Sequence, residues 1–145
     1  REGYADWKSD ELWERYFTEV VAAARTGLFD VVAHVDLVKK FGVWPDGPTR
    51  DLYRTLAAAL AATDVAVEVN TAGLRKPCRE LYPGQDLLRA LCDAGVPATI
   101  GSDAHAPAEV GAGPAEAREA LIEAGYRSAL VFRGRKARGV GIDAI

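Results

Sequence analysis

The sequence contains four short apolar segments, most of them rich in valine, that recur at intervals of roughly 30 residues or a little more. They span residues 28–35, 65–69, 96–100 and 129–132. Short apolar runs of this kind are typical of parallel strands that are buried on both faces of a sheet. Because helical patterns lie between these segments, the sequence predicts an α/β protein built from βα units, either a doubly wound sheet or a TIM-like barrel.

The helices are predicted from apolar residues that repeat on one face and from start and stop signals. The first helix is expected to begin with Ser9 as its N-cap and to stop at Gly27. Its predicted buried stripe is Leu12, Tyr16, Val20 and Ala24. Further helices are expected after the turn "WPDGPTR", over residues 86–94, and from Pro114 onward. Since four strands are too few to close a barrel of the usual size, a barrel implies that part of it is missing.

Composition and charge exclude several classes of partner. The chain has 145 residues and a formal net charge of -3, which gives no general attraction to nucleic acid or to a membrane surface. No apolar run approaches the roughly 18 residues of a membrane-spanning helix, and no signal peptide is visible, so a cytoplasmic location is expected. The basic segment "RGRKARG" is interpreted as an exposed hairpin rather than as a nucleic-acid site.

The start of the sequence is unusual. The chain opens on Arg1 and contains no methionine, and its first clear structural element begins near Ser9. We interpret it as a piece of a longer protein.

Polar side chains gather where the first three predicted strands end. They are His34 and Asp36, then Glu68, Asn70, Thr71, Arg75 and Lys76, and finally Ser102, Asp103 and His105. In both candidate architectures the carboxyl ends of the strands lie at one rim, and functional groups collect there. The only two histidines of the chain are therefore predicted to reach the same rim.

These residue types at this rim allow two interpretations. Residues i and i+2 of an extended segment point the same way, so Asp103 and His105 would reach one metal ion, with His34 close by. The alternative is that each histidine is a hydrogen-bonded structural residue. Arg75 and Lys76 are either part of a solvated loop or an anion site, in which a guanidinium binds a phosphate through two oxygens.

Three segments carry a family resemblance. "LFDVVAHVDLVKKFG", "VEVNTAGLRKP" and "GVPATIGSDAHAPAEVG", in this order, resemble the PHP-type histidinol-phosphate phosphatases, and "GSDAH" and "NTAGLRK" are the most specific motifs. The resemblance implies the later half of a distorted (βα)7 TIM-like barrel, the PHP fold. Residues 1–145 would be the C-terminal part of a single PHP domain, incomplete without upstream chain.

The resemblance also implies a chemistry. By motif, His34, Asp103 and His105 resemble ligands of a cluster of two or three divalent ions (zinc, manganese or iron), and Arg75 resembles an arginine that holds the substrate phosphate. Asp103 and His105 would be the catalytic residues in the hydrolysis of L-histidinol phosphate to L-histidinol and phosphate, a step of histidine biosynthesis. Ala106 stands where many relatives have a basic residue that contacts phosphate, which leaves one phosphate contact without a counterpart.

Two alternatives remain open from the sequence. One is a PHP-family phosphoesterase of other specificity, and the other is a non-catalytic PHP-like remnant that acts as a structural or binding module. The family's HxH motif and its further ligands lie upstream of anything in this chain. The expected partners are therefore a small phosphorylated substrate and the missing N-terminal half of the barrel, and residues 1–145 alone are expected to be inactive.

Overall fold

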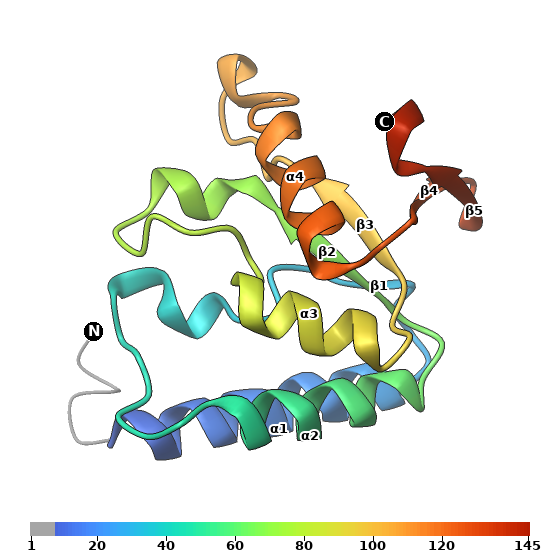
Figure 1. The fold of residues 1–145 in the computed structure, drawn as a ribbon. Coiled ribbons are helices and arrows are strands. Elements are labelled where there is room, and N and C mark those ends of the chain that lie inside the picture. Colours follow the sequence, from blue (N-terminus) through green and yellow to red (C-terminus); the bar gives the residue numbers. More distant parts are fainter. Residues whose placement is uncertain (1–7) are drawn as a thin grey trace.

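A computed structural model describes residues 8–145, with Phe41 described by its backbone only (Figure 1). Its centre is a parallel sheet of β1 (Val31–Val32), β2 (Ala66–Asn70) and β3 (Ala98–Gly101), in the order β1-β2-β3. The register pairs β2 with β3 from Val67 opposite Ala98 to Asn70 opposite Gly101. All three carboxyl ends consequently lie at one edge, as the sequence predicts.

The helices pack side by side in chain order, α1 against α2, α2 against α3 and α3 against α4 (Figure 1). They are α1 (Ser9–Arg25), α2 (Arg50–Ala61), α3 (Gln85–Asp93) and α4 (Pro114–Ala124). Short 3-10 helices follow the sheet edge at Leu37–Phe41, Thr71–Arg75 and Pro107–Glu109. None of the described helices is long and apolar enough to cross a membrane.

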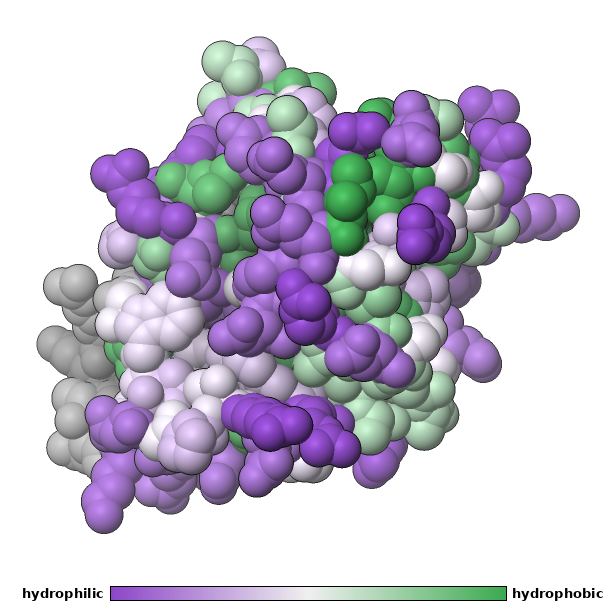
Figure 2. Space-filling view, in the orientation of Figure 1, coloured by the Kyte–Doolittle hydropathy of each residue, from purple (hydrophilic) through white to green (hydrophobic). Residues whose placement is uncertain are grey.

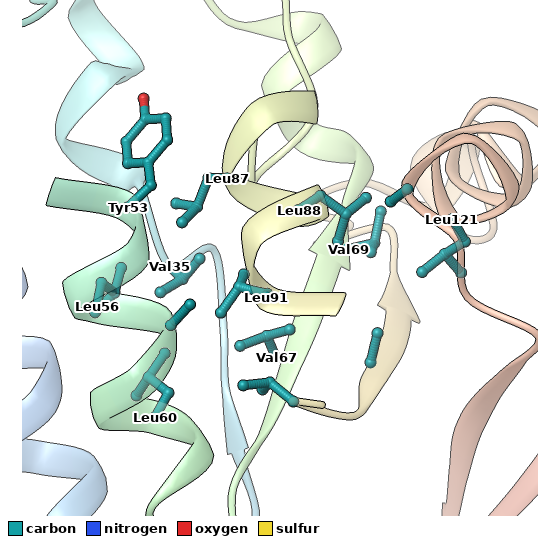
Figure 3. Close-up of a cluster of buried hydrophobic side chains, with 14 of the residues drawn as sticks. Val35, Tyr53, Leu56, Leu60, Val67, Val69, Leu87, Leu88, Leu91 and Leu121 are labelled. Atoms are coloured by element: carbon teal, nitrogen blue, oxygen red, sulfur yellow. The ribbon is translucent and has the colours of Figure 1, made fainter. Parts of the chain in front are cut away.

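The core lies between the sheet and the helices (Figure 3). Val67 and Val69 are fully buried from β2, and α3 contributes Leu88 and Leu91. Burying each such side chain contributes roughly 1.5–3 kcal/mol. Because strand side chains alternate, the other face of β2 carries the polar Glu68 and Asn70.

The buried face of α1 differs from the predicted one. Trp13 and Phe17 are buried, whereas three of the four predicted stripe residues, Leu12, Tyr16 and Val20, are only half-buried. The rings of Trp13 and Phe17 meet edge-on with 5.5 Å between centroids, and such aromatic packing determines which face turns inward. The N-cap is Lys8, because the Ser9 hydroxyl donates to the Asp46 carboxylate instead, at 2.7 Å.

The predicted strand 28–35 is shortened to β1 at its centre. Leu28 and Phe29 are 72% and 53% exposed, so the prediction of burial is wrong for them. In the described chain β1 pairs with β2 only, which leaves its other edge without a partner strand. At the other end, His34 has a φ of 34°, a left-handed conformation that cannot continue a strand.

The fourth predicted strand is not part of the parallel sheet. β4 (Ser128–Arg133) pairs antiparallel with β5 (Lys136–Gly141), so the prediction of a buried parallel strand is wrong and that of an exposed hairpin is confirmed. Gly134 and Arg135 both have positive φ, as a two-residue hairpin turn requires. Val131 and Phe132 remain partly exposed, and Figure 2 shows apolar surface in this region.

The tip of the hairpin is tied to the start of β1. The Arg135 guanidinium donates to both carboxylate oxygens of Asp30, at 2.8 and 3.2 Å. These hydrogen bonds, together with the positive charge of Arg135, hold the pKa of Asp30 below its usual value. The contact therefore stabilises the folded chain above the unfolded-state pKa of Asp30 and is lost as the pH falls through the lower, folded-state pKa.

We expect the Asp30 carboxyl group to titrate below its ordinary pKa of 3.8 in the folded chain. Arg135→Gln removes the cation, so the midpoint should return toward the ordinary value, while Arg138→Gln on the same hairpin should leave it unchanged. Carboxyl-carbon NMR during an acid titration measures both. An Asp30 midpoint that is the same in wild type and Arg135→Gln would show that the ion pair does not form in solution.

Candidate active site

Three loops follow the carboxyl ends of β1, β2 and β3 and carry all the predicted site residues. His34 lies in the first, Arg75 ends the 3-10 helix of the second, and Asp103 and His105 lie in the third. The common edge of the sheet is what brings these loops together.

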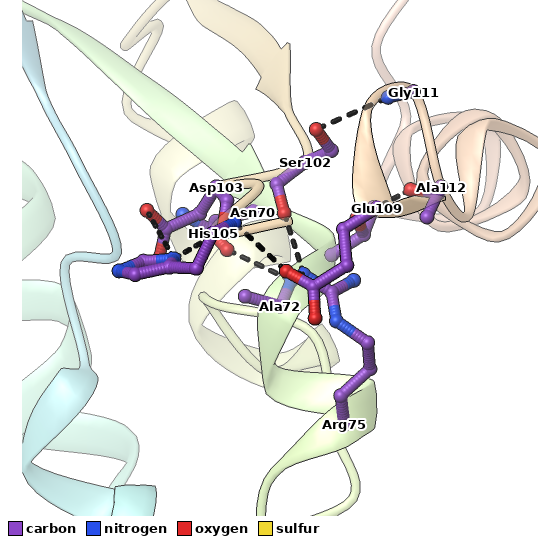
Figure 4. A network of polar contacts seen from close by, with 10 residues as sticks. Asn70, Ala72, Arg75, Ser102, Asp103, His105, Glu109, Gly111 and Ala112 are labelled. Carbon is purple, nitrogen blue, oxygen red and sulfur yellow. Dashed lines mark hydrogen bonds and ion pairs between the residues drawn. The ribbon is translucent and has the colours of Figure 1, made fainter. Parts of the chain in front are cut away.

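Asp103 and His105 are adjacent, though not through the extended geometry that the sequence suggests. Asp103 has a φ of 47°, and this left-handed residue folds the His105 ring back over it (Figure 4). The His105 Nδ1 lies 2.8 Å from the Asp103 carbonyl oxygen and 3.9 Å from its carboxylate. A carbonyl oxygen only accepts, so in the neutral ring Nδ1 carries the proton and Nε2 presents a free lone pair. Metal-binding histidines are commonly oriented in this way.

His34 has an unsatisfied nitrogen. Its Nδ1 is buried and has no hydrogen-bond partner among the described residues. A buried polar atom in this state costs roughly 1–3 kcal/mol, which a ligand would offset. Its left-handed backbone is a second local cost, and such costs cluster at functional sites. Both features fit a metal ligand.

Tyr82 packs beside the first histidine-bearing loop. Its ring meets that of His34 edge-on at 6.5 Å between centroids. Burial is the main reason why the pKa of the Tyr82 hydroxyl is raised, followed by its contact with Cys78 and by the negative charges of Asp36 and Asp103.

The three predicted ligands do not form a closed set. Within residues 8–145, Phe41 side chain aside, no three His, Cys, Asp or Glu side chains lie close enough to hold a metal ion. The structure therefore pairs Asp103 with His105 and places His34 at the same edge of the sheet, but it does not join the three into one group.

Arg75 is oriented with part of its guanidinium unused. Its Nη2 donates to the Ser102 carbonyl oxygen at 2.9 Å and to a Glu109 carboxylate oxygen at 3.5 Å (Figure 4). A guanidinium has five N–H donors, and those on Nε and Nη1 have no acceptor among the described residues. These unused N–H groups can each donate to an anion oxygen, which favours an anion site over a solvated loop.

Asn70 fixes the turn that carries Arg75. The Asn70 side-chain oxygen accepts from the backbone N–H of Ala72 at 2.9 Å and so caps the 3-10 helix. Its amide donates to Glu68 at 2.8 Å, and the Thr71 hydroxyl donates to the Ala112 carbonyl at 2.6 Å. The polar residues at the end of β2 therefore hold the turn that carries Arg75 in place.

Asp36, predicted at the rim, is used for structure. It forms a buried ion pair with Lys39, with 2.7 Å between Oδ2 and Nζ and both side chains at most 1% exposed. Lys39 also contacts Glu80 at 3.0 Å and lies 5.5 Å from the ring centres of Trp44 and Tyr82. Burial raises the pKa of Asp36, and Lys39 partly offsets this rise. This ion pair supports the Tyr82 side of the site.

Glu109 is the functional candidate that sequence reasoning missed. One of its carboxylate oxygens accepts from the His105 backbone N–H at 2.8 Å and from Arg75. The His105 N–H, more than the Arg75 charge, holds the pKa of Glu109 below its usual value. Its position in the short helix Pro107–Glu109 follows from a turn with no motif of its own.

Comparison with known proteins identifies relatives of this arrangement. The chain is 43% identical over 125 residues to a probable histidinol-phosphatase of Deinococcus radiodurans, covering 86% of this chain and 47% of that protein. It is 30% identical over 113 residues to one of Thermotoga maritima, covering 77% of this chain and 48% of that protein. No protein-family model matches the chain.

The fold has a solved counterpart. A crystal structure of the histidinol phosphate phosphatase of Lactococcus lactis, complexed with zinc, L-histidinol and phosphate, superposes with a TM-score of 0.71. The identity is 22%, and the match covers 94% of this chain and 54% of that one. This likeness shows that the two chains share a fold.

By its parallel sheet and flanking helices, the chain is an α/β protein of the architecture found in a phosphatase. More particularly, it is a relative of the histidinol-phosphatases, and the resemblance to PHP-type histidinol-phosphate phosphatases is confirmed. The chain spans about half the length of the curated relatives that it matches.

Removing Lys39 should destabilise the chain strongly. Lys39→Ala leaves Asp36 as a buried carboxyl without its cation, and breaking such a pair typically costs about 3–5 kcal/mol. Urea unfolding monitored by tryptophan fluorescence measures the loss. The exposed Lys136→Ala serves as the control and should change the free energy of unfolding by less than about 0.5 kcal/mol. Equal stabilities of the two variants would contradict a buried ion pair at this position.

Proposed function

We propose that this chain forms part of a metal-dependent phosphomonoesterase that hydrolyses L-histidinol phosphate. The observation that carries the proposal is the set of unused N–H donors of Arg75 next to the Asp103–His105 pair, at the sheet edge where a buried His34 nitrogen has no partner among the described residues. The names of the relatives support the reaction, and the zinc, L-histidinol and phosphate of the Lactococcus lactis structure support the ligands.

We assign the metal ligands to His34, Asp103 and His105. Two imidazole nitrogens and a carboxylate suit zinc, manganese or iron. Because the described residues do not form a three-ligand group, the remaining ligands of a site with two or three ions must come from elsewhere. We propose that they come from an N-terminal half of the same domain, with residues 1–145 as the C-terminal part of a (βα)7 PHP barrel. The half-length match to the relatives supports this assignment.

The site residues of this chain would then have separate roles in the hydrolysis. When bound, the divalent ions would lower the pKa of a water and offset negative charge on the phosphoryl oxygens. An unused N–H group of Arg75 would donate to a phosphate oxygen and help to orient the phosphorus. The Asp103 carboxylate would hold the attacking water and take its proton. As the new P–O bond forms, the ester P–O bond breaks, and the leaving oxygen takes up the proton that Asp103 removed, directly or through solvent, so that histidinol leaves as the alcohol.

The function is tested by phosphate release from L-histidinol phosphate with added zinc or manganese. We expect turnover by a longer protein that includes the upstream half, and none by residues 1–145 above the level of their own His105→Ala variant. Metal-dependent turnover by residues 1–145 would show that this half is sufficient. No turnover by the longer protein would favour the non-catalytic remnant, and turnover of other phosphomonoesters alone would favour a different specificity.

Arg75→Ala in the longer protein should weaken substrate capture more than metal binding. One charge-assisted hydrogen-bond contact is worth roughly 1.5–3 kcal/mol, so kcat/KM should fall by about one to two powers of ten. Metal content, measured by elemental analysis, should stay unchanged. Lys76→Ala, one residue further along the same turn, is the matched control. A kcat/KM equal to that of wild type would assign Arg75 to the solvated loop.

A further inference from the structure

Glu109 connects the two groups that the proposed function assigns to different tasks. The same Oε2 atom accepts from the His105 backbone N–H at 2.8 Å and from the Arg75 Nη2 at 3.5 Å. The phosphate-binding arginine and the metal-binding loop are thus linked through a single carboxylate (Figure 4). Nothing in the sequence motifs accounts for this link.

We propose that Glu109 is a positioning residue that holds the Arg75 guanidinium at a fixed position relative to the Asp103–His105 loop. The proposal rests on the proposed function, because it assumes that these groups bind phosphate and metal. Glu109 would touch neither substrate nor ion. Its effect would be to fix the distance between the Arg75 guanidinium and the metal ligands before the substrate arrives.

The guanidinium is held from two sides. Ser102 offers its carbonyl oxygen to Nη2 at 2.9 Å, and Glu109 approaches the same nitrogen from the following turn. Two acceptors on one nitrogen restrict the rotation of the group and leave the N–H donors of Nε and Nη1 unpaired among the described residues. Ordering a long side chain in advance lowers the entropy that binding would otherwise cost.

The turn that carries Glu109 is itself anchored. The Glu109 backbone N–H donates to the Ala106 carbonyl at 2.9 Å, and the Gly111 N–H donates to the Ser102 hydroxyl at 3.2 Å. The Thr71 hydroxyl connects Ala112 to the turn after β2. Glu109 is consequently presented by a closed loop rather than by a free one, which allows its carboxylate to act as a fixed acceptor.

The role needs an acceptor oxygen rather than a negative charge. The carboxylate is about a third exposed, and its charge partly opposes the attraction of Arg75 for a phosphate. A glutamine at this position keeps an oxygen of the same reach and loses the charge. Alanine loses both, so the two substitutions separate positioning from electrostatics.

The test uses the metal-loaded longer protein with Glu109→Ala, Glu109→Gln and the exposed helix residue Glu119→Ala as the matched control. We expect Glu109→Ala to raise the KM for L-histidinol phosphate and the Kd of inorganic phosphate about tenfold each, with kcat changed less than about threefold. Glu109→Gln should stay within about threefold of wild type in all three constants. Calorimetry gives the phosphate Kd independently of turnover, and circular dichroism confirms folding.

Unchanged KM and phosphate Kd in Glu109→Ala would overturn the proposal. A fall in both kcat and metal content with an unchanged phosphate Kd would also overturn it. Glu109 would then stabilise only the loop that carries Asp103 and His105. Equal losses of phosphate affinity in Glu109→Gln and Glu109→Ala would also overturn the proposal, because the charge of Glu109 would then matter rather than its acceptor oxygen. Failure of the proposed function is distinct, since wild type would then release no phosphate while the phosphate Kd values still report on the coupling.

Discussion

The parallel pairing of β2 with both of its neighbours is the constraint on which the rest of the structure depends. It sets three carboxyl ends at one edge, and every loop that carries a candidate site residue leaves from that edge. The pairing is maintained by apolar burial on the helix side, where Val67 and Val69 pack against α3. The stability of the core and the assembly of the site therefore have the same origin.

The alternation of side chains along β2 links this core to the site chemistry. Valines on one face hold the strand in place, and on the opposite face Asn70 caps the turn that carries Arg75. Below the first loop, the buried pair of Asp36 and Lys39 supports Tyr82 against His34. Asn70 and Asp36 therefore hold neighbouring residues in place, and under the proposed function Arg75 and the two histidines are left to meet the ligands.

Sequence patterns predicted the elements whose signal is local and missed those that depend on a partner. The helix from Pro114 to Ala124 and the strand 65–69 follow from periodicity and start signals, and the structure has both. The run 129–132 has the same apolar signal as a buried strand, yet its pairing is decided by the turn after it. The Asp103–His105 geometry depends on a left-handed backbone angle, and the Glu109 contact depends on tertiary placement, neither of which residue spacing reports.

An unpaired strand edge and an unpaired side-chain nitrogen have one explanation under the proposed function. Within residues 8–145, β1 has a partner strand on one side only, and an open strand edge is an unfavourable feature that proteins usually cover. His34, two residues after β1, has a buried nitrogen that finds no partner in the same part of the chain. An additional strand against β1 would cover the edge and bring further ligands next to His34. Completion of the sheet and completion of the metal site would then be a single event, so metal binding would stabilise the whole domain rather than this half alone.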